Sequence, residues 1–240
     1  MNKQSNVYTI IYSSVMVIIV AAVLAFAALS LKAPQQRNIE IDKMKQILSS
    51  IKVTATADDA QQLYKKYIIG SKVIDAAGKE IADADAFNVN VAMQVKLPDA
   101  QRQLPIFIAK VEDGSTKYII PMYGAGLWGP IWGYLSIDSD GKTVYGAYFA
   151  HQGETPGLGA EIDRPAFYGQ FCGKDLFAGG DEFKSIAVQK AGQKPLNGAD
   201  YVDAISGGTI TSKGVEAMLS NSLKPYETFL KTLQTQKIAE

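Results

Sequence analysis

The chain has 240 residues, which is enough for one well-buried domain but too few to assume two complete ones. It contains 24 Lys and Arg residues and 24 Asp and Glu residues, so no net charge favours nucleic acid or a strongly acidic surface as a partner. The single cysteine, Cys172, excludes an internal disulfide and any multi-cysteine zinc or iron–sulfur site within the chain.

An uncharged run of 25 residues, at positions 7–31, is long enough to cross a bilayer as a helix. A cleaved signal peptide is an alternative because AFA and AAL offer small residues for cleavage, but its apolar region should be shorter and its start more basic. A buried core helix is disfavoured because the run is apolar on every face. We therefore expect a retained single-pass anchor at 7–31, after a short N-terminus at 1–6.

The charges that flank this run leave its orientation open. Lys3 precedes it, whereas Lys32, Arg37, Lys43 and Lys45 follow it. The positive-inside tendency would therefore keep the large domain in the cytoplasm, but this tendency weakens for long translocated domains.

A polar, proline-containing segment at 32–37 predicts a linker to one domain at 38–240. The domain begins with two predicted helices, of which the first is amphipathic. The second begins near Thr56, where Thr56 and Asp59 form a loose capping-box pattern, and runs through LYKKYII to Ile69. The apolar residues of the first helix are Ile41, Met44, Ile47, Leu48 and Ile51.

From about Phe87 the pattern changes to the alternation that is typical of strands. Two Asp-Gly pairs, Asp113-Gly114 and Asp140-Gly141, lie between alternating β-branched and aromatic residues, which is a strong hairpin signal. We therefore expect an antiparallel sheet. Its strands should lie within 89–97, 105–123 and 133–150.

Short helical and irregular pieces follow the sheet, with a predicted strand at 185–190. A terminal helix is predicted at 212–233, bent at Pro225. Helices before and after a hairpin-built sheet predict an α+β fold, in which a twisted antiparallel sheet is flanked by helices. Cys172 lies among aromatic residues, where we expect a small buried apolar side chain rather than a reactive thiol.

The first of three glycine-marked segments is YGAGLWGPIWGYL, at 123–135. Glycine lets the backbone approach a flat partner closely, and the aromatic residues supply stacking area. The alternative is a tight, well-packed turn into the sheet.

The second glycine-marked segment is HQGETPGLGAEI, at 151–162. Gly157 and Gly159 flank Leu158, so this loop can press amide groups and one apolar side chain against a ligand. It lacks the G-x-G-x-x-G spacing of a dinucleotide fingerprint, and no Walker-type GK[ST] accompanies it. His151, the only histidine, is more typical of a hydrogen-bonded structural residue than of a metal ligand, because metal sites usually recruit several partners.

The third segment is DAISGGTITSKGV, at 203–215, in which two glycines interrupt a run of hydroxyl side chains. A glycine pair before a helix N-terminus can form an amide-lined concavity for a phosphate, and nearby hydroxyls can be esterified to it. No histidine lies nearby in the sequence to activate a hydroxyl as a nucleophile. The alternative is that Thr211 or Ser212 is an N-cap and that the glycines form the preceding turn.

These three segments, in this order behind one N-terminal anchor, resemble the FMN-binding C subunit of the Na⁺-translocating NADH:quinone oxidoreductase across essentially the whole chain. In that family an S-G-A-T signature carries FMN on its threonine through a phosphoester bond. Here the signature is S-G-G-T at 206–209, with Gly208 in place of alanine. The resemblance implies covalent FMN on Thr209, installed by a dedicated flavin transferase that recognises Asp203.

ETPGLG at 154–159 and GLWGPIWG at 126–133 also match the family, and the latter favours it over the G subunit of the related Rnf complex. The resemblance implies an electron-transfer subunit that is not catalytic alone and binds no metal. Its partners would be the membrane, the flavin transferase and other subunits of a quinone reductase that oxidises NADH and transports Na⁺. The resemblance also implies a large domain on the periplasmic side of a bacterial inner membrane, which the flanking charges do not predict.

The FMN site that the resemblance implies has an accessible flavin edge, glycine loops on one side of the ring, and hydroxyl and amide donors, including Thr211 and Ser212, for the phosphate. Its residues are Trp128, Glu154, Thr155, Gly157, Leu158, Gly159, Ser206, Gly207, Gly208, Thr209, Ile210 and Thr211.

Three other functions remain as alternatives. The chain can be a G-subunit-like FMN carrier of an Rnf-type complex, or a membrane-tethered binding domain without a cofactor, in which the glycines are only turns. It can also be a hydrolase that uses Ser206 or Thr209 with His151 and Asp203, although no G-x-S-x-G nucleophile elbow is present.

Overall fold

The computed structural model describes residues 5–179 and 181–238, so most of the expected N-terminal segment at 1–6 lies outside the described residues. Helix α1 (Asn6–Ser50) contains the whole predicted span at 7–31 and is long and apolar enough to cross a membrane. None of its apolar window is buried, which contradicts the alternative of a core helix.

The expected linker at 32–37 is helical, and Pro34 lies inside α1. Proline removes one helical N–H, but most residues of the following QQRNIEIDKMKQ segment are compatible with a helix, so the helix continues. The chain separates into two compact units, Met1–Lys43 and Met44–Glu240, whereas the sequence placed the start of the domain at residue 38. The domain boundaries stay a prediction.

Five antiparallel strands form the main sheet of the second unit, in the order β1-β2-β3-β4-β5. Asp-Gly turns join β2 to β3 and β4 to β5, where Gly114 and Gly141 have φ of +80° and +70°. Only glycine adopts these values without steric cost, so both predicted hairpins are confirmed for a physical reason. The strands are β1 (Ile68–Ile74), β2 (Leu104–Lys110), β3 (Thr116–Ala125), β4 (Pro130–Asp138) and β5 (Val144–His151).

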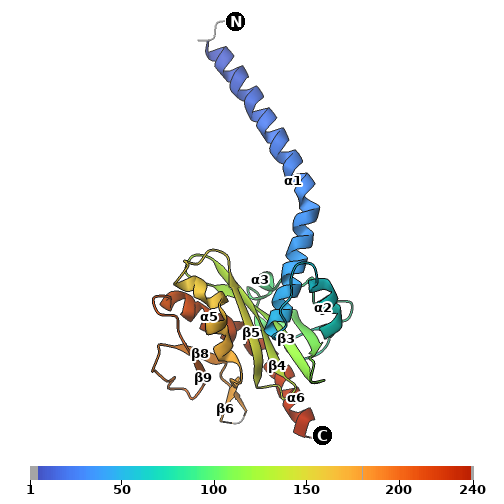
Figure 1. Cartoon of the computed structure of the whole chain (residues 1–240), viewed down its shortest axis with the longest axis vertical. Coiled ribbons are helices and arrows are strands. Elements are labelled where there is room, and N and C mark those ends of the chain that lie inside the picture. The colour runs from blue at the N-terminus through green and yellow to red at the C-terminus, as the bar shows by residue number, and fades with distance from the viewer. Residues whose placement is uncertain (1–4, 180, 239–240) are drawn as a thin grey trace. The chain divides into compact units, whose positions relative to one another are not determined.

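Apolar side chains are buried on both faces of this sheet, and α5 lies alongside its strands in Figure 1. Phe107 packs with α2 and the last turns of α1, whereas its neighbour Ile106 packs with α5 and α6. This division follows from the alternation of side chains along a strand. The predicted α+β domain, with an antiparallel sheet flanked by helices, is confirmed. These helices are α2 (Ala60–Tyr67), α5 (Thr209–Leu223) and α6 (Glu227–Ile238).

The terminal helix is confirmed, including the bend at Pro225, because a single 3-10 turn, η4 (Lys224–Tyr226), separates α5 from α6. The helix begins at Thr209 rather than at Ser212. The predicted strand at 185–190 is also confirmed as β8 (Ile186–Gln189). The shorter elements are α3 (Val91–Gln94), η1 (Asp99–Gln101), η2 (Gly159–Asp163), α4 (Pro165–Tyr168), η3 (Gly169–Phe171), β6 (Phe177–Ala178), β7 (Glu182–Phe183), β8 (Ile186–Gln189) and β9 (Asp200–Asp203).

Two further secondary-structure predictions are wrong. The second helix does not run to Ile69, because β1 begins at Ile68 and pairs with β2. The expected strand at 89–97 instead contains α3, which starts because the Asn90 side chain accepts the Met93 N–H at 3.2 Å. In both places a tertiary or capping contact overrides the local apolar pattern.

The prediction that Cys172 is buried is also wrong, since this cysteine is exposed. The aromatic neighbours Phe167 and Phe171 fill the core, and Cys172 follows the end of η3 on the surface. Its Sγ lies 3.1 Å from Lys52 Nζ.

Candidate functional site

The three glycine-marked segments meet at one pocket of about 360 Å³. They come from the turn between β3 and β4, the loop after β5, and the start of α5. The volume falls in the range of small-molecule sites, roughly 300–1,000 Å³. The lining residues are Leu127, Trp128, Glu154, Thr155, Leu158, Gly159, Gly207, Gly208, Thr209, Ile210 and Thr211.

The carboxylate of Glu154 links the three segments. Its Oε1 accepts the Trp128 N–H at 2.8 Å, and its Oε2 accepts the Thr211 hydroxyl at 2.5 Å. Burial, with only 5% of the residue exposed, raises the pKa of Glu154. The hydrogen bonds from Thr211 and from the backbone of 127–129 outweigh this effect and hold that pKa below its usual range. Glu154 is therefore an ionised, buried link between two loops and a helix.

Two glycines leave room for this carboxylate. A Cβ on Gly126 would lie 2.5 Å from Glu154 Oε1. A Cβ on Gly159 would overlap Glu154 Oε2 and would lie 2.5 Å from Thr211 Oγ1. Because any side chain at either position displaces the carboxylate, these glycines are needed for the hydrogen bonds that assemble the pocket.

Thr209 is exposed and is the first residue of α5. The N-cap before it, Gly208, has no side chain to accept the N–H groups of the first turn. Gly207 has φ of +75°, the left-handed region that favours glycine, and it turns the chain into the helix. The Thr209 hydroxyl thus lies where the helix dipole and the first-turn N–H groups favour an anion.

Large apolar side chains around the pocket are exposed, although such residues are usually buried in a soluble domain. Exposed fractions are 47% for Leu127, 69% for Trp128, 41% for Leu158 and 60% for Ile210. All of them line the pocket. A gathering of exposed apolar side chains at a cavity is typical of a ligand-binding or interaction site.

Comparison with known proteins identifies the family. A family model described as an FMN-binding domain matches residues 126–224. The C subunit of the Na(+)-translocating NADH-quinone reductase of Neisseria meningitidis serogroup B is 32% identical, with 98% of each chain covered. The chain belongs to this C-subunit family. The corresponding protein of Yersinia pestis is also 32% identical, over 90% of this chain and 87% of that protein.

Solved structures agree with this assignment. The crystal structure of the C subunit of the same reductase from Parabacteroides distasonis is 50% identical, with a TM-score of 0.78 over 83% of this chain and 96% of that one. Shewanella oneidensis NqrC, at 24% identity and a TM-score of 0.67 over 82% of this chain and 99% of that one, shows the shared fold. The resemblance read from the three glycine-marked segments is therefore confirmed.

The family motif at 154–159 forms a tight turn at the pocket. The Thr155 carbonyl accepts the N–H groups of Leu158 and Ala160, and this turn projects Leu158 outward. Gly157 has φ of +74°, and its N–H donates to Glu161 Oε1 at 3.0 Å. Gly157 therefore shapes the loop but does not line the pocket, unlike the other residues predicted in this segment.

Two functional residues predicted in the third segment, Ser206 and Asp203, lie outside the pocket. Ser206 is exposed and lines a neighbouring cavity of about 460 Å³, which Thr209 also borders. Asp203, the predicted recognition residue, is exposed at the end of β9, and its N–H donates to Gln170 Oε1 at 2.9 Å.

The hydroxyls of Thr211 and Ser212 differ from the expectation that both donate to a phosphate. Thr211 donates to Glu154, and the Ser212 hydroxyl accepts the Ile205 N–H at 3.0 Å. Both are buried within α5, so the alternative that one of them is the N-cap of the terminal helix is wrong. They hold the glycine turn against the helix, which leaves Thr209 as the exposed hydroxyl that this third segment contributes to the pocket.

His151 has the role of a hydrogen-bonded structural residue, as predicted. Its Nδ1 accepts the Glu154 N–H at 3.1 Å, and its Nε2 lies 3.8 Å from Asp163 Oδ2. Within the part of the chain that the structure describes, these contacts do not include Ser206, Thr209 or Asp203. The geometry therefore gives the hydrolase hypothesis no support.

Sequence reasoning missed Leu127 as a pocket residue and Gly126 as the glycine that makes room for Glu154. The signal was present in the GLWG string, in which two glycines flank an apolar pair. It was not decisive, because the same string also predicts a tight turn.

Proposed function

We propose that this chain is an electron-carrying subunit of a Na⁺-translocating NADH-quinone reductase and holds FMN on Thr209 through a phosphoester bond. The observation that carries the proposal is the exposed Thr209 hydroxyl at the start of α5, on the rim of a pocket with exposed apolar walls. The FMN-binding family model and the relatives named as C subunits of this reductase support it.

The start of α5 suits the phosphate of this link. A phosphodiester carries one negative charge, and a helix N-terminus stabilises such a charge by about 0.3–1 kcal/mol at an exposed site. Gly208 has φ of −105°, which an alanine also adopts, but a Cβ there would lie 3.0 Å from Ile205 Cγ2. Glycine at this position therefore avoids crowding against Ile205 and the Leu158 backbone rather than supplying a special backbone conformation.

The apolar walls suit a flavin ring. We infer that Trp128 and Leu158 flank the ring, since both line the pocket and expose large apolar surfaces to it. Glu154 fixes the backbone of Trp128 to the helix that carries Thr209, so the walls and the attachment point keep their spacing. When bound, the flavin supplies the electron transfer, and the protein contributes placement and electrostatics.

The proposal also covers the setting of the domain. We infer that α1 anchors it to a bacterial inner membrane and that the domain lies on the periplasmic side, since long domains translocate despite flanking positive charge. A covalent link keeps a permanently high effective concentration of flavin there. The exposed Asp203 is accessible to a flavin transferase, and the other subunits of the reductase are the electron partners.

Intact-mass measurement tests the attachment. The chain co-expressed with a flavin transferase should gain the mass of one FMN less one water, and its yellow colour should survive denaturation. Thr209→Val should abolish both, whereas Ser206→Ala, which changes a neighbouring exposed hydroxyl, should retain them. A Thr209 peptide of unmodified mass from native membranes would refute the proposal.

The single cysteine tests the membrane side, because Cys172 is exposed. A membrane-impermeant maleimide should label Cys172 in intact spheroplasts, with Cys172→Ser as the blank. Labelling that requires lysis would place the domain in the cytoplasm instead.

A further inference from the structure

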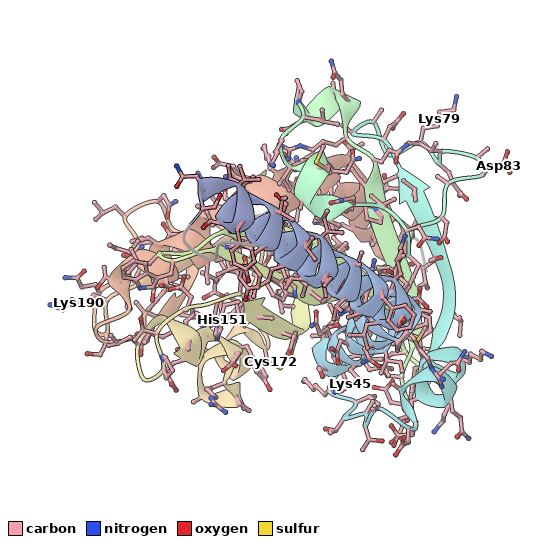
Figure 2. The ribbon with its side chains drawn as sticks, turned by 90° about the horizontal axis from the view of Figure 1, so that it is seen from above. Lys45, Lys79, Asp83, His151, Cys172 and Lys190 are labelled. Carbon is pink, nitrogen blue, oxygen red and sulfur yellow. The ribbon has the colours of Figure 1, made fainter. Side chains whose placement is uncertain are left out.

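His151 is labelled among the elements of the domain in Figure 2, whereas Lys79 and Lys190 project from its edge. The Nδ1 atom of the His151 ring accepts the Glu154 N–H at 3.1 Å. A ring nitrogen that accepts a hydrogen bond carries no proton, so this contact requires a neutral imidazole with its proton on Nε2. The structure thus selects one tautomer and one charge state.

The residue that His151 holds is the one that assembles the pocket. Glu154 donates its N–H to His151, while its carboxylate accepts the Trp128 N–H and the Thr211 hydroxyl. The side chain of Glu154 can bridge a loop and α5 only if its backbone starts from the correct place. His151 acts on that backbone without lining the pocket itself.

We propose that His151 is a positioning residue for the pocket. In its neutral form it holds the backbone of Glu154 in place, and on protonation it releases that backbone. Protonation places a hydrogen on Nδ1, where it faces the Glu154 N–H. Two donors then oppose each other and the hydrogen bond is lost. Histidine is the side chain whose ordinary titration falls between pH 5 and 8, so a pH scan across that range tests the release.

The charged groups around His151 give the imidazolium a second partner. Asp163 lies at the end of η2, and its Oδ2 lies 3.8 Å from His151 Nε2. Arg164 Nε lies 3.2 Å from Asp163 Oδ1 and forms an ion pair with this carboxylate, which compensates part of its charge. Glu161 is occupied by the Gly157 N–H, and the Glu154 carboxylate by Trp128 and Thr211. Asp163 is therefore the carboxylate that the Nε2 side of a protonated His151 faces.

Amide hydrogen exchange tests this without any cofactor. In the full chain in detergent, the protection factor of the Glu154 N–H, corrected for intrinsic exchange, is measured from pH 8 to pH 5. It should fall by roughly fivefold, as expected for the loss of one ordinary hydrogen bond. The midpoint should match that of the His151 ring, followed by the NMR shift of its C2 proton.

Two amide variants separate positioning from simple packing. His151→Asn places an oxygen acceptor where Nδ1 lies and does not titrate, so Glu154 should stay protected at every pH. His151→Gln places its polar group at the Nε2 position and should leave Glu154 unprotected at every pH. Equal protection in the two variants, a His151 ring that stays neutral to pH 5, or a ring that titrates while Glu154 protection stays flat would overturn the inference.

The consequence for the cofactor rests on the proposed function. In the FMN-loaded chain, flavin fluorescence should show the same pH transition, and His151→Asn should remove it. If Thr209 proves unmodified while the exchange transition is present, the proposed function fails and the role of His151 stands. If Thr209 carries FMN and the fluorescence transition persists in His151→Asn, the role of His151 in the flavin pocket is overturned.

Discussion

Gly159→Ala should destabilise the domain by about 3 kcal/mol, because the added methyl group competes with a buried hydrogen bond. Its Cβ would overlap Glu154 Oε2 and lie 2.5 Å from Thr211 Oγ1 and 3.2 Å from Thr211 Cβ. The side chains of Glu154 and Thr211 are hydrogen-bonded to each other, so neither can move away without breaking that bond. Overpacking costs about 1–3 kcal/mol, and a lost hydrogen bond to a charged group costs about 1.5–3 kcal/mol.

Gly153→Ala is the matched control, since it lies in the same loop and a Cβ there meets nothing within 4 Å. Urea unfolding of the full chain in detergent, followed by tryptophan fluorescence, suits the comparison. Of the two tryptophans, Trp128 lines the pocket and Trp132 lies on β4. Gly159→Ala should unfold at clearly lower urea than Gly153→Ala. If the two variants differ by less than about 0.5 kcal/mol, the geometry around Glu154 does not carry the energy assigned to it.

Two further predictions concern the same carboxylate. Thr211→Val should lower the free energy of unfolding, measured in urea, by about 1.5–3 kcal/mol, because a buried carboxylate oxygen loses its hydrogen-bond donor. Thr209→Val, at an exposed position, should stay within about 0.5 kcal/mol of the wild type. Equal losses in the two variants would contradict this prediction. The pKa of Glu154 is lowered by folding, so its ionised form stabilises the fold above the usual glutamate range near pH 4.3, and this contribution disappears as the pH falls through the lowered folded-state value. Glu154→Gln should therefore flatten the acid side of a stability curve measured from pH 7 to pH 3, and an unchanged acid limb would show that the carboxylate is not the group responsible.

Features with local causes were predictable from the sequence. The hairpins follow from Asp-Gly pairs, which supply the positive φ that the turns need. The bend at Pro225 follows from a missing N–H. The glycines also singled out the three segments that line the pocket, because they mark places where a backbone approaches another group closely, and the family resemblance implied that these segments form one site.

Features that depend on distant contacts were not predictable. The hydrogen bond between Glu154 and Thr211 joins residues that are 57 positions apart, so nothing in either segment alone indicates it. The Thr211 and Ser212 hydroxyls were expected to face a phosphate, and both are used inside the protein instead. Cys172 was misplaced because its aromatic neighbours, rather than the thiol, fill the core.

The link through Glu154 has a consequence for the order of events during biosynthesis. The pocket draws on the β3–β4 turn, the loop after β5 and the first turn of α5, so it does not exist until the C-terminal part of the chain has been made and docked. A nascent chain that ends before residue 211 has the glycine loops but no Thr211 hydroxyl for the Glu154 carboxylate. A modifying enzyme that reads the finished shape around Thr209 would therefore act only on protomers that have completed folding.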